Sequence, residues 1–412
     1  MIQSNPQMVL PNTLIFFLQI ALGLPITQGP MLGDLTDSSV KMWVRSSEPT
    51  QVIVVLQNSC LTFEATTTED TDLTAIIQLS GLEPSTMYNY FINGEHRDSW
   101  WFKTSPKDDP HVKIAFGSCA NEKEGSSKVW NRMNADNIDA LVLLGDTPYI
   151  DTTDLAIQRK RYREFAEVPA FADLVSHTPV YSIWDDHDFG RNDTDGNLVG
   201  KEKSRQAFSE YRPNPSLGEE GQGIYTKFRK GPVEVFLLDA RWFARTEKSE
   251  NKINTLLGKQ QWAWLERSLK ASTAPFKILA CGMIFNDATR LGKTDYWGNY
   301  PTEYYRLLSV IKRNSISGIS LVSGDIHWSR VIKHDTKSKI GYDLIEFITS
   351  PIHEKLISAA NAPHEGDLFS IGEINSFLLL NATRNAEART LTMTITNASG
   401  EALHVQTISH QE

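Results

Sequence analysis

Short, mainly apolar runs that each end in an acidic residue constrain the fold of this chain more than any other feature. Residues 140–144 form such a run, and so do 181–184 and 320–323. Runs of this kind are typical of strands that are covered on both faces of a sheet. Helical stretches at 154–167 and 258–270 lie between these runs, and this order predicts an α/β domain.

The side chains that follow the apolar runs are the candidate functional residues. In open α/β sheets, ligands bind beyond the carboxyl ends of the strands. The groups found there in this chain are Cys119, Asp146, Asp186, His187, Asp325 and His327. Because several carboxylates at one edge would repel each other unless cations or protons neutralise them, the pattern predicts a site for more than one metal ion.

The first hundred residues follow a different pattern, which predicts an all-β domain. Residues 40–44 alternate in polarity, and 51–56 form a β-branched run. A Leu-x-Pro turn at 82–84 leads into a Tyr-x-Tyr strand at 88–90, as in the tyrosine corner of immunoglobulin and fibronectin sandwiches. We therefore expect a small fibronectin/immunoglobulin-like sandwich domain over residues 27–105.

Composition also predicts where the domains begin and end. The polar segment 105–110 holds two prolines and predicts a linker, so the second domain is expected at 111–412.

Residues 14–24 are apolar except for Gln19. This run is too short to cross a membrane but long enough for a signal-peptide core. No Lys or Arg occurs in the first 40 residues, so residues 1–26 are expected to be either a signal peptide or an N-terminal extension. A signal peptide predicts an extracytoplasmic protein, periplasmic or secreted, and an extension predicts a cytoplasmic one.

The charge balance excludes one class of partner. Lys and Arg total 41 against 50 Asp and Glu, which gives a net charge of −9. Dedicated nucleic-acid-binding domains usually carry a basic surface, so no nucleic-acid-binding role is expected. Three cysteines in 412 residues exclude a disulfide scaffold. We expect a monomer with no transmembrane helix.

The donor atoms beyond the apolar runs indicate which metals fit. Asp146 can bridge two cations with its two oxygens, and Tyr149 follows it on the same turn as a phenolate ligand. Asp325 and His327 stand at i and i+2, on one side of an extended segment. Cys119 adds a thiolate. This mixture of donors suits a ferric ion beside hard divalent cations better than a structural zinc ion.

Four motifs in this order resemble those of the PhoD-type alkaline phosphatases of the calcineurin-like metallophosphoesterase superfamily. They are Gly117-Ser-Cys119, Gly145-Asp-Thr-Pro-Tyr149, Trp184-Asp-Asp-His-Asp-Phe-Gly190 with Asn192-Asp193, and Ser323-Gly-Asp-Ile-His-Trp328. The resemblance covers nearly the whole chain. It implies that 111–412 is a catalytic domain with a four-layer sandwich, in which helices flank two mixed sheets.

The resemblance also assigns roles to individual residues. It implies a centre with Fe³⁺ and Ca²⁺, or with other divalent metals. Cys119, Asp146 and Tyr149 would hold the ferric ion, with Asp146 bridging to calcium. The residues that would complete the calcium side are Asp186, Asn192, Asp325 and His327. The residues that would contact the phosphate are His187 and Arg241.

The implied function is hydrolysis of phosphomonoesters and phosphodiesters. Hydroxide activated by the metal ions would attack phosphorus, and His187 would protonate the leaving alkoxide. One alternative keeps the metals but acts as a phospholipase D-like phosphodiesterase on phospholipid or teichoic-acid-like diesters. A further alternative is a non-catalytic surface binding protein. It requires the loss of metal ligands, and none of the family's ligand positions is lost here.

Overall fold

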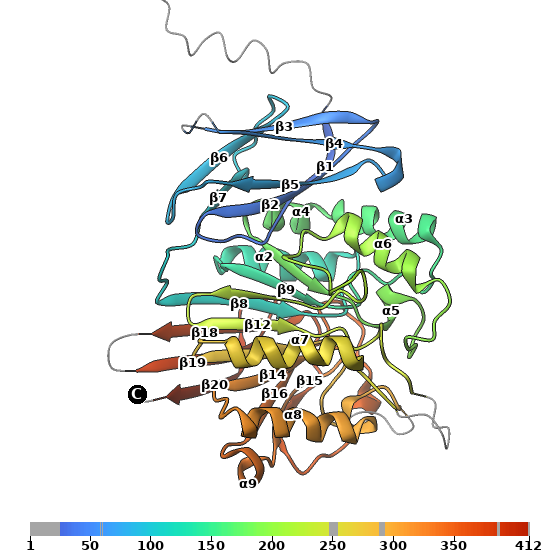
Figure 1. The fold of residues 1–412 in the computed structure, drawn as a ribbon, viewed down its shortest axis with the longest axis vertical. Coiled ribbons are helices and arrows are strands. Elements are labelled where there is room, and N and C mark those ends of the chain that lie inside the picture. The colour runs from blue at the N-terminus through green and yellow to red at the C-terminus, as the bar shows by residue number, and fades with distance from the viewer. Residues whose placement is uncertain are drawn as a thin grey trace, which may run out of the picture.

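Two mixed β-sheets lie at the centre of the second part of the chain and share one hydrophobic core (Figure 1). The residues that the computed structural model describes are 25–57, 59, 61–246, 254–287, 293–384 and 388–410. The apolar run 14–24, expected as the core of a signal peptide, lies outside the described residues. Helices cover the outer faces of both sheets, so mixed sheets with helices are confirmed for this part of the chain.

The first sheet has the strand order β10-β9-β8-β18-β19-β20. Its first three strands are parallel, and β18 pairs antiparallel with β8. The bounds of its strands are β8 (His111–Gly117), β9 (Ala140–Leu144), β10 (Val180–Ile183), β18 (Ser376–Arg384), β19 (Arg389–Asn397) and β20 (Ala402–His410).

The C-terminal strands correct one expectation. The sequence alone predicts an added antiparallel hairpin layer from the strand-like runs at 376–382, 390–396 and 402–408. The three strands do pair antiparallel, but they extend the first sheet outward from β8. The residues of β8 that pair with β18 lie more than 260 positions earlier in the sequence, so this pairing leaves no local signal.

The second sheet has the strand order β11-β12-β13-β14-β16-β15-β17. Four adjacent strands of this sheet pair in parallel, namely β12, β13, β14 and β16. The bounds of its strands are β11 (Thr226–Lys230), β12 (Val233–Leu237), β13 (Phe276–Ala280), β14 (Ile319–Ser323), β15 (Ser329–His334), β16 (Leu344–Ile348) and β17 (Asp367–Ile371).

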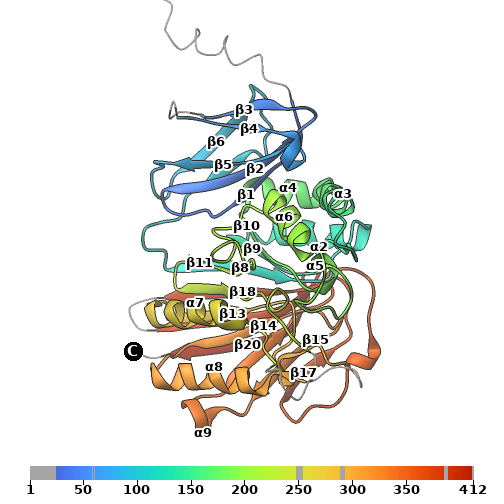
Figure 2. The same ribbon diagram turned by 45° about the vertical axis from the view of Figure 1, so that its right-hand side comes forward.

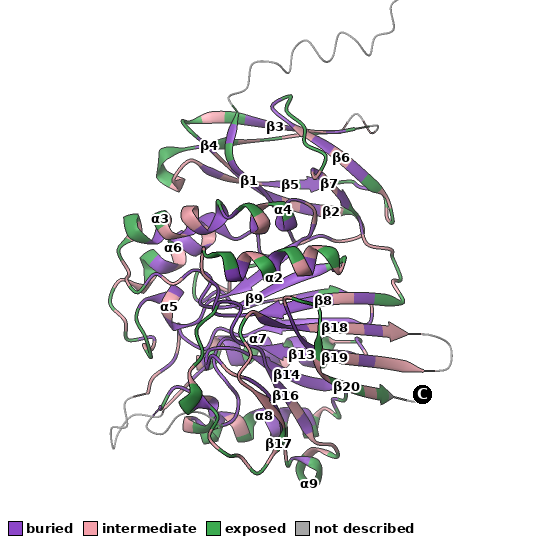
Figure 3. Cartoon of the chain, turned by 180° about the vertical axis from the view of Figure 1, so that it is seen from behind, coloured by how far each residue is buried: buried purple, intermediate pink, exposed green. Residues whose placement is uncertain are grey.

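Complete burial explains why the central strands have so little polar alternation. Every residue of β9, β10, β12, β13 and β14 is buried (Figure 3). Side chains such as Leu141 and Val235 meet in the core between the two sheets. The expectation of strands covered on both faces is therefore confirmed.

Helices complete the layers on either side of the sheets. The helices that pack on the first sheet are α2 (Glu124–Ala135), α3 (Leu155–Ala166), α4 (Pro169–His177) and α6 (Lys201–Tyr211), and those on the second are α7 (Gly258–Ala271) and α8 (Pro301–Arg313). The short helices are η1 (Glu69–Thr71), α5 (Asp186–Phe189), η2 (Trp297–Asn299), α9 (Lys337–Ile340) and η3 (Ser358–Ala360). Among the described helices, none is long and apolar enough to span a membrane.

The N-terminal part is all-β, as expected, and has its own hydrophobic cluster. One sheet has the order β1-β2-β5 and the other β4-β3-β6-β7. The strand bounds are β1 (Ile26–Gly33), β2 (Ser39–Ser46), β3 (Thr50–Leu56), β4 (Thr62–Thr67), β5 (Thr74–Ser80), β6 (Met87–Ile92) and β7 (Trp101–Lys103). The Glu83 amide donates a hydrogen bond to the Tyr88 hydroxyl at 2.9 Å, which is the contact that a tyrosine corner makes.

Polar contacts hold the N-terminal sheets against α3, α4 and α6 (Figure 2). The Asp72 carboxylate accepts hydrogen bonds from Arg163 and from the Tyr211 hydroxyl. The Trp43 indole N–H donates to the Glu210 carbonyl at 2.8 Å from a fully buried position. These contacts lie at the end of the molecule away from the second sheet, so the N-terminal part buttresses the helices over the first sheet.

Candidate metal centre

The candidate metal ligands lie where strands of the two sheets end and their following loops meet. Cys119 follows β8, Asp146 follows β9 and Asp186 follows β10, while Asp325 and His327 follow β14 of the second sheet. All five side chains are buried. The structure thus brings together, in one place, the strand-end residues that the sequence indicated.

Their ligand atoms form overlapping groups in which all atoms lie within 4.8 Å of one another. The first group is Cys119, Asp146 and His327, and the second is Asp146, Asp186 and His187. A third contains Asp185, Asp186 and Asp325. Because Asp146 belongs to two groups and Asp186 links the second group to the third, the arrangement fits adjacent cations bridged by carboxylates.

The backbone at these positions is strained in a way that points to function. Cys119, Asp146, Asp325 and His327 all have positive φ, between 53° and 68°. A non-glycine residue in this left-handed region costs about 1–3 kcal/mol, and such residues cluster at active sites. Gly145 provides the close approach between loops, since a Cβ there would lie 2.4 Å from the Asp185 amide nitrogen. The loops are therefore shaped to aim the ligands rather than to minimise local strain.

The sulfur and phenol donors lie on one side of the centre. The Cys119 sulfur is 3.6 Å from an Asp146 oxygen, and the Tyr149 hydroxyl is 2.9 Å from Nε2 of His327. His353 places its Nε2 3.0 Å from the same hydroxyl. The Lys355 amide donates to Nδ1 of His353 at 2.9 Å, so the ring proton of neutral His353 sits on Nε2 and points at the Tyr149 oxygen.

The protonation of these groups reflects burial and crowded negative charge. Burial and then the charge of Asp146 raise the pKa of the Cys119 thiol well above its usual value. Burial and the neighbouring carboxylates, Asp186 first, likewise raise the pKa of Asp146. Burial and the nearby His353 lower the pKa of His327 to about 3, so its ring is neutral and able to bind a metal. A bound cation would reverse the first two shifts, because it stabilises thiolate and carboxylate.

The donor set therefore fits the implied metal ions. Nδ1 of His327 is buried and has no hydrogen-bond partner among the described residues, although its other nitrogen contacts Tyr149. Thiolate, phenolate and imidazole donors suit a transition metal, and the carboxylate oxygens suit a hard divalent cation. The two kinds of donor are segregated, with Cys119 on one side of Asp146 and Asp186 on the other.

On the oxygen side, the acidic residue next to the predicted ligand Asn192 lies close to the other carboxylates. Oxygens of Asp193, Asp186 and Asp295 lie within 4.8 Å of one another, and Asp193 is exposed, as Asn192 is. The Asp193 amide donates to an Asp186 oxygen at 2.7 Å. Asn192 as a calcium ligand stays a prediction, because no described contact of its side chain reaches the cluster.

Arg241 lies in a different environment from the one expected. Its side chain is fully buried, and Nε donates to Asp185 at 2.6 Å. Its two terminal nitrogens donate to the Asp295 carboxylate at 2.8 and 2.7 Å, and one of them also to the Thr194 carbonyl. These contacts make Arg241 a residue that positions two buried carboxylates. Its expected contact with the phosphate stays a prediction.

His187 lies at the rim of the centre, where the sequence placed a proton-transfer group. Its Nδ1 is 2.5 Å from an oxygen of Asp151, and the ring is half-buried against Tyr149. Asp151 was missed by the sequence analysis because it lies seven residues beyond a strand end, within a loop. Its position two residues after Tyr149 is the only signal that could have found it.

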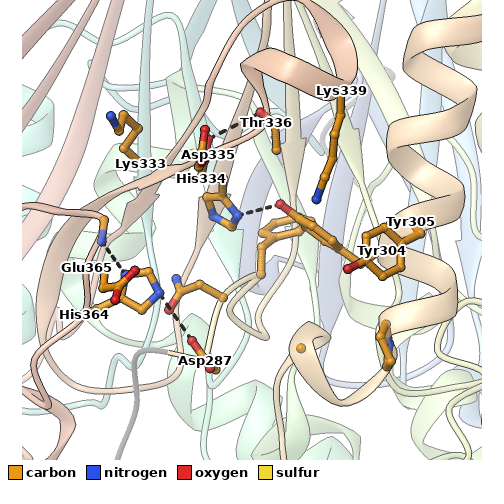
Figure 4. A pocket seen from close by; sticks show the side chains of 15 residues that line it. Asp287, Tyr304, Tyr305, Lys333, His334, Asp335, Thr336, Lys339, His364 and Glu365 are labelled. Carbon is orange, nitrogen blue, oxygen red and sulfur yellow. Dashed lines mark hydrogen bonds and ion pairs between the residues drawn. The ribbon is translucent and has the colours of Figure 1, made fainter.

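A separate pocket of about 510 Å³ is lined by residues of α8, of β15 and of nearby segments, and none of the candidate ligands lines it (Figure 4). Its wall includes Tyr304 and His334, which are joined by a 2.7 Å hydrogen bond. His334 also contacts the buried carboxylate of Glu346 at 2.9 Å, and Glu346 accepts a hydrogen bond from Ser323 at 2.6 Å. Because Ser323 ends β14, this chain of hydrogen bonds fixes the strand end that carries Asp325.

Two family models match the chain in adjacent segments. The model described as PhoD-like phosphatase matches residues 114–396, and one described as a domain of unknown function matches residues 24–112. The first match spans more than half of the chain and contains every candidate metal ligand.

A relative and a solved structure agree with this match. Alkaline phosphatase D of Bacillus subtilis (strain 168) is 24% identical over 399 residues, which cover 77% of this chain and 67% of the relative. A solved structure described as the structure of PhoD superposes with a TM-score of 0.73 and 19% identity. The superposition covers 95% of this chain and 91% of the chain in that structure, so the fold is shared over nearly the whole length.

The burial of Arg241 generates a prediction that separates positioning from phosphate binding. Arg241→Gln leaves Asp185 and Asp295 buried without their partner, a change that typically costs about 3–5 kcal/mol. We expect the free energy of unfolding, measured by denaturant titration of the metal-free protein, to fall by about that amount. Arg267→Gln is the control, because its partner Glu219 is exposed and the loss should stay within about 1 kcal/mol. Normal stability with only a raised KM would restore Arg241 as a phosphate contact.

Proposed function

The chain belongs to the PhoD-like phosphatase family and is a metal-dependent phosphoester hydrolase, and we propose that its centre combines a ferric ion with calcium. The observation that carries the proposal is the set of overlapping ligand groups that share Asp146 and Asp186. A sulfur-containing group at one end and all-carboxylate groups at the other favour two chemically different cations.

Cys119, Asp146 and Tyr149 are the proposed ferric ligands. Grouping of His327 with Cys119 and Asp146 supports placing this histidine on the iron side, whereas the resemblance placed it with calcium. Asp186 and Asp325 are the proposed calcium ligands, with Asp146 between the two ions. Asn192 remains a proposed ligand from the resemblance alone.

Metal ions held by these residues would lower the pKa of a water molecule and offset negative charge on the phosphoryl oxygens. The protein supplies the remaining parts. His187 is held by Asp151 through Nδ1, which orients the ring. A protonated ring at the rim can deliver a proton to the leaving oxygen. His353 holds the Tyr149 oxygen through a hydrogen bond and so fixes the direction of that ligand.

We further propose two domains, residues 27–105 as an immunoglobulin/fibronectin-like sandwich and 111–412 as a four-layer catalytic domain. The separate N-terminal hydrophobic cluster and the meeting of the two family matches between residues 112 and 114 support this division. The apolar run 14–24 supports an extracytoplasmic location, periplasmic or secreted. A monomeric state is proposed as well.

The activity and its calcium dependence are tested together. We expect the purified protein to hydrolyse p-nitrophenyl phosphate and bis-p-nitrophenyl phosphate, and a chelator to abolish both reactions while iron stays bound. Carboxylate-bound calcium exchanges readily, so added calcium should restore the rates. Full activity after exhaustive chelation would contradict the proposal. A rate on the diester far above that on the monoester would favour the phosphodiesterase alternative.

The iron assignment predicts a coloured protein. Phenolate and thiolate ligands of a ferric ion give charge-transfer absorption at visible wavelengths, so Tyr149→Phe should shift or remove the band. Tyr305→Phe is the matched control, because that ring is largely exposed on the far pocket and the spectrum should not change. A colourless and fully active preparation that contains only zinc would rule out iron.

The role of His187 predicts a dependence on the leaving group. His187→Ala should lower kcat by about 10²–10⁴, the usual range for loss of a positioned acid or base. The loss should be smaller for p-nitrophenolate, which needs little protonation, than for an alkyl phosphate. Metal content, measured by elemental analysis, should stay at the wild-type value, whereas Asp186→Ala should lose metal. If His187→Ala loses metal in proportion to activity, His187 is a ligand and not the acid.

A further inference from the structure

A buried lysine lies within the oxygen side of the centre. The side chain of Lys293 is only 3% exposed, and its ammonium nitrogen is 2.7 and 2.9 Å from the two oxygens of Asp325. It is also 3.3 Å from Asp193 and 3.8 Å from Asp295. A lysine is rarely buried to this extent unless carboxylates pair with it. Lys293 therefore places a fixed positive charge among residues that could themselves hold a cation.

The carboxylates of this region divide between two basic side chains. The Arg241 guanidinium pairs with Asp185 and with both carboxylate oxygens of Asp295. Lys293 holds Asp325 and lies against Asp193. Asp186, Asp193 and Asp295 offer oxygens within 4.8 Å of one another, a group that could hold a divalent cation. A cation bound there would lie close to the Lys293 ammonium, and the two positive charges would repel at short range.

We propose that Lys293 determines metal specificity by taking the place of a further divalent cation in the Asp186–Asp193–Asp295 group. The proposal rests on the proposed function, because Asp186 also belongs to the metal centre. The ammonium supplies the positive charge that this group needs without binding a metal. Calcium is then confined to the side shared with Asp146, and the number of divalent cations per chain is set by the protein rather than by the ion concentration.

The chemistry of the side chain supports this role over that of a metal ligand. A protonated ammonium donates hydrogen bonds and has no lone pair to offer a cation. Lys293 engages both oxygens of Asp325, so it also competes with calcium for that ligand. Removing its charge therefore ends the competition for Asp325 and eliminates the repulsion, and both changes strengthen calcium binding.

The test counts calcium ions on metal-stripped protein. Lys293→Met removes the charge and keeps most of the apolar stem, while Lys293→Arg keeps the charge. By isothermal titration with calcium alone, we expect Lys293→Met to bind one more calcium ion per chain than the wild type, or to bind calcium at least tenfold more tightly. Lys293→Arg should titrate like the wild type. Lys333→Met removes an exposed charge near the far pocket and should also leave the titration unchanged.

Equal stoichiometry and equal affinity in the wild type and Lys293→Met would overturn the proposal, and so would weaker binding in the variant. Lys293→Met could also fail to fold, because it leaves the buried carboxylate of Asp325 without its partner and removes a positive charge from beside Asp193 and Asp295. The double variant Lys293→Met with Asp193→Asn reduces that repulsion, and it should fold but show no extra calcium ion, since one oxygen ligand of the group is gone. If the double variant gains the extra ion, Asp193 is not part of the group and the proposal fails.

The outcome is separable from that of the proposed function. Calcium stoichiometry is measured without substrate, and hydrolysis of p-nitrophenyl phosphate by the wild type is measured in parallel. If the wild type does not hydrolyse the substrate but Lys293→Met binds the extra calcium ion, the activity is refuted and the role of Lys293 stands. Normal hydrolysis with unchanged calcium binding in Lys293→Met would refute only the role of Lys293.

Discussion

The repulsion among buried carboxylates is the constraint on which the rest of this structure depends. Asp146, Asp185, Asp186, Asp295 and Asp325 are all buried within one region, where their charges are poorly screened. Each must be neutralised by a proton, a basic side chain or a metal ion. Among the described residues, Arg241 and Lys293 are the basic side chains that pair with these five carboxylates, so the remaining negative charge is left for metal ions.

The fold satisfies this constraint because buried strands provide a rigid frame, and the loops that follow them carry the candidate metal ligands. The core between the sheets and the buried strands β9 and β14 fix where the loops begin. Backbone strain at Cys119 and His327, both with positive φ, is then held by that rigid frame. At the end of β14, Ser323 donates a hydrogen bond to Glu346 of the neighbouring strand β16. A loop on a less rigid support would relax, and its ligands would move apart.

The sequence was sufficient to find the residues whose signal is local. Cys119, Asp146 and Asp325 each follow an apolar run directly, and strand ends in α/β sheets meet by geometry. The carboxylate partners of Arg241 gave no such signal, because Asp185 and Asp295 lie more than 50 residues away on either side. Partners at that separation are brought together only by tertiary structure. The pairing of the C-terminal strands with β8 was missed for the same reason.

The same reasoning explains why basic residues in such a centre are hard to interpret from sequence. An arginine or lysine near phosphate chemistry suggests substrate binding, yet burial changes what its charge can do. Arg241, with its planar group between two carboxylates, neutralises charge permanently and leaves no donor free for a small anion. Lys293, a compact charge beside Asp325, acts at the position where a cation would otherwise bind. The number of metal ions in the centre therefore depends on the balance between acidic ligands and internal basic groups, and counting ligands alone overestimates it.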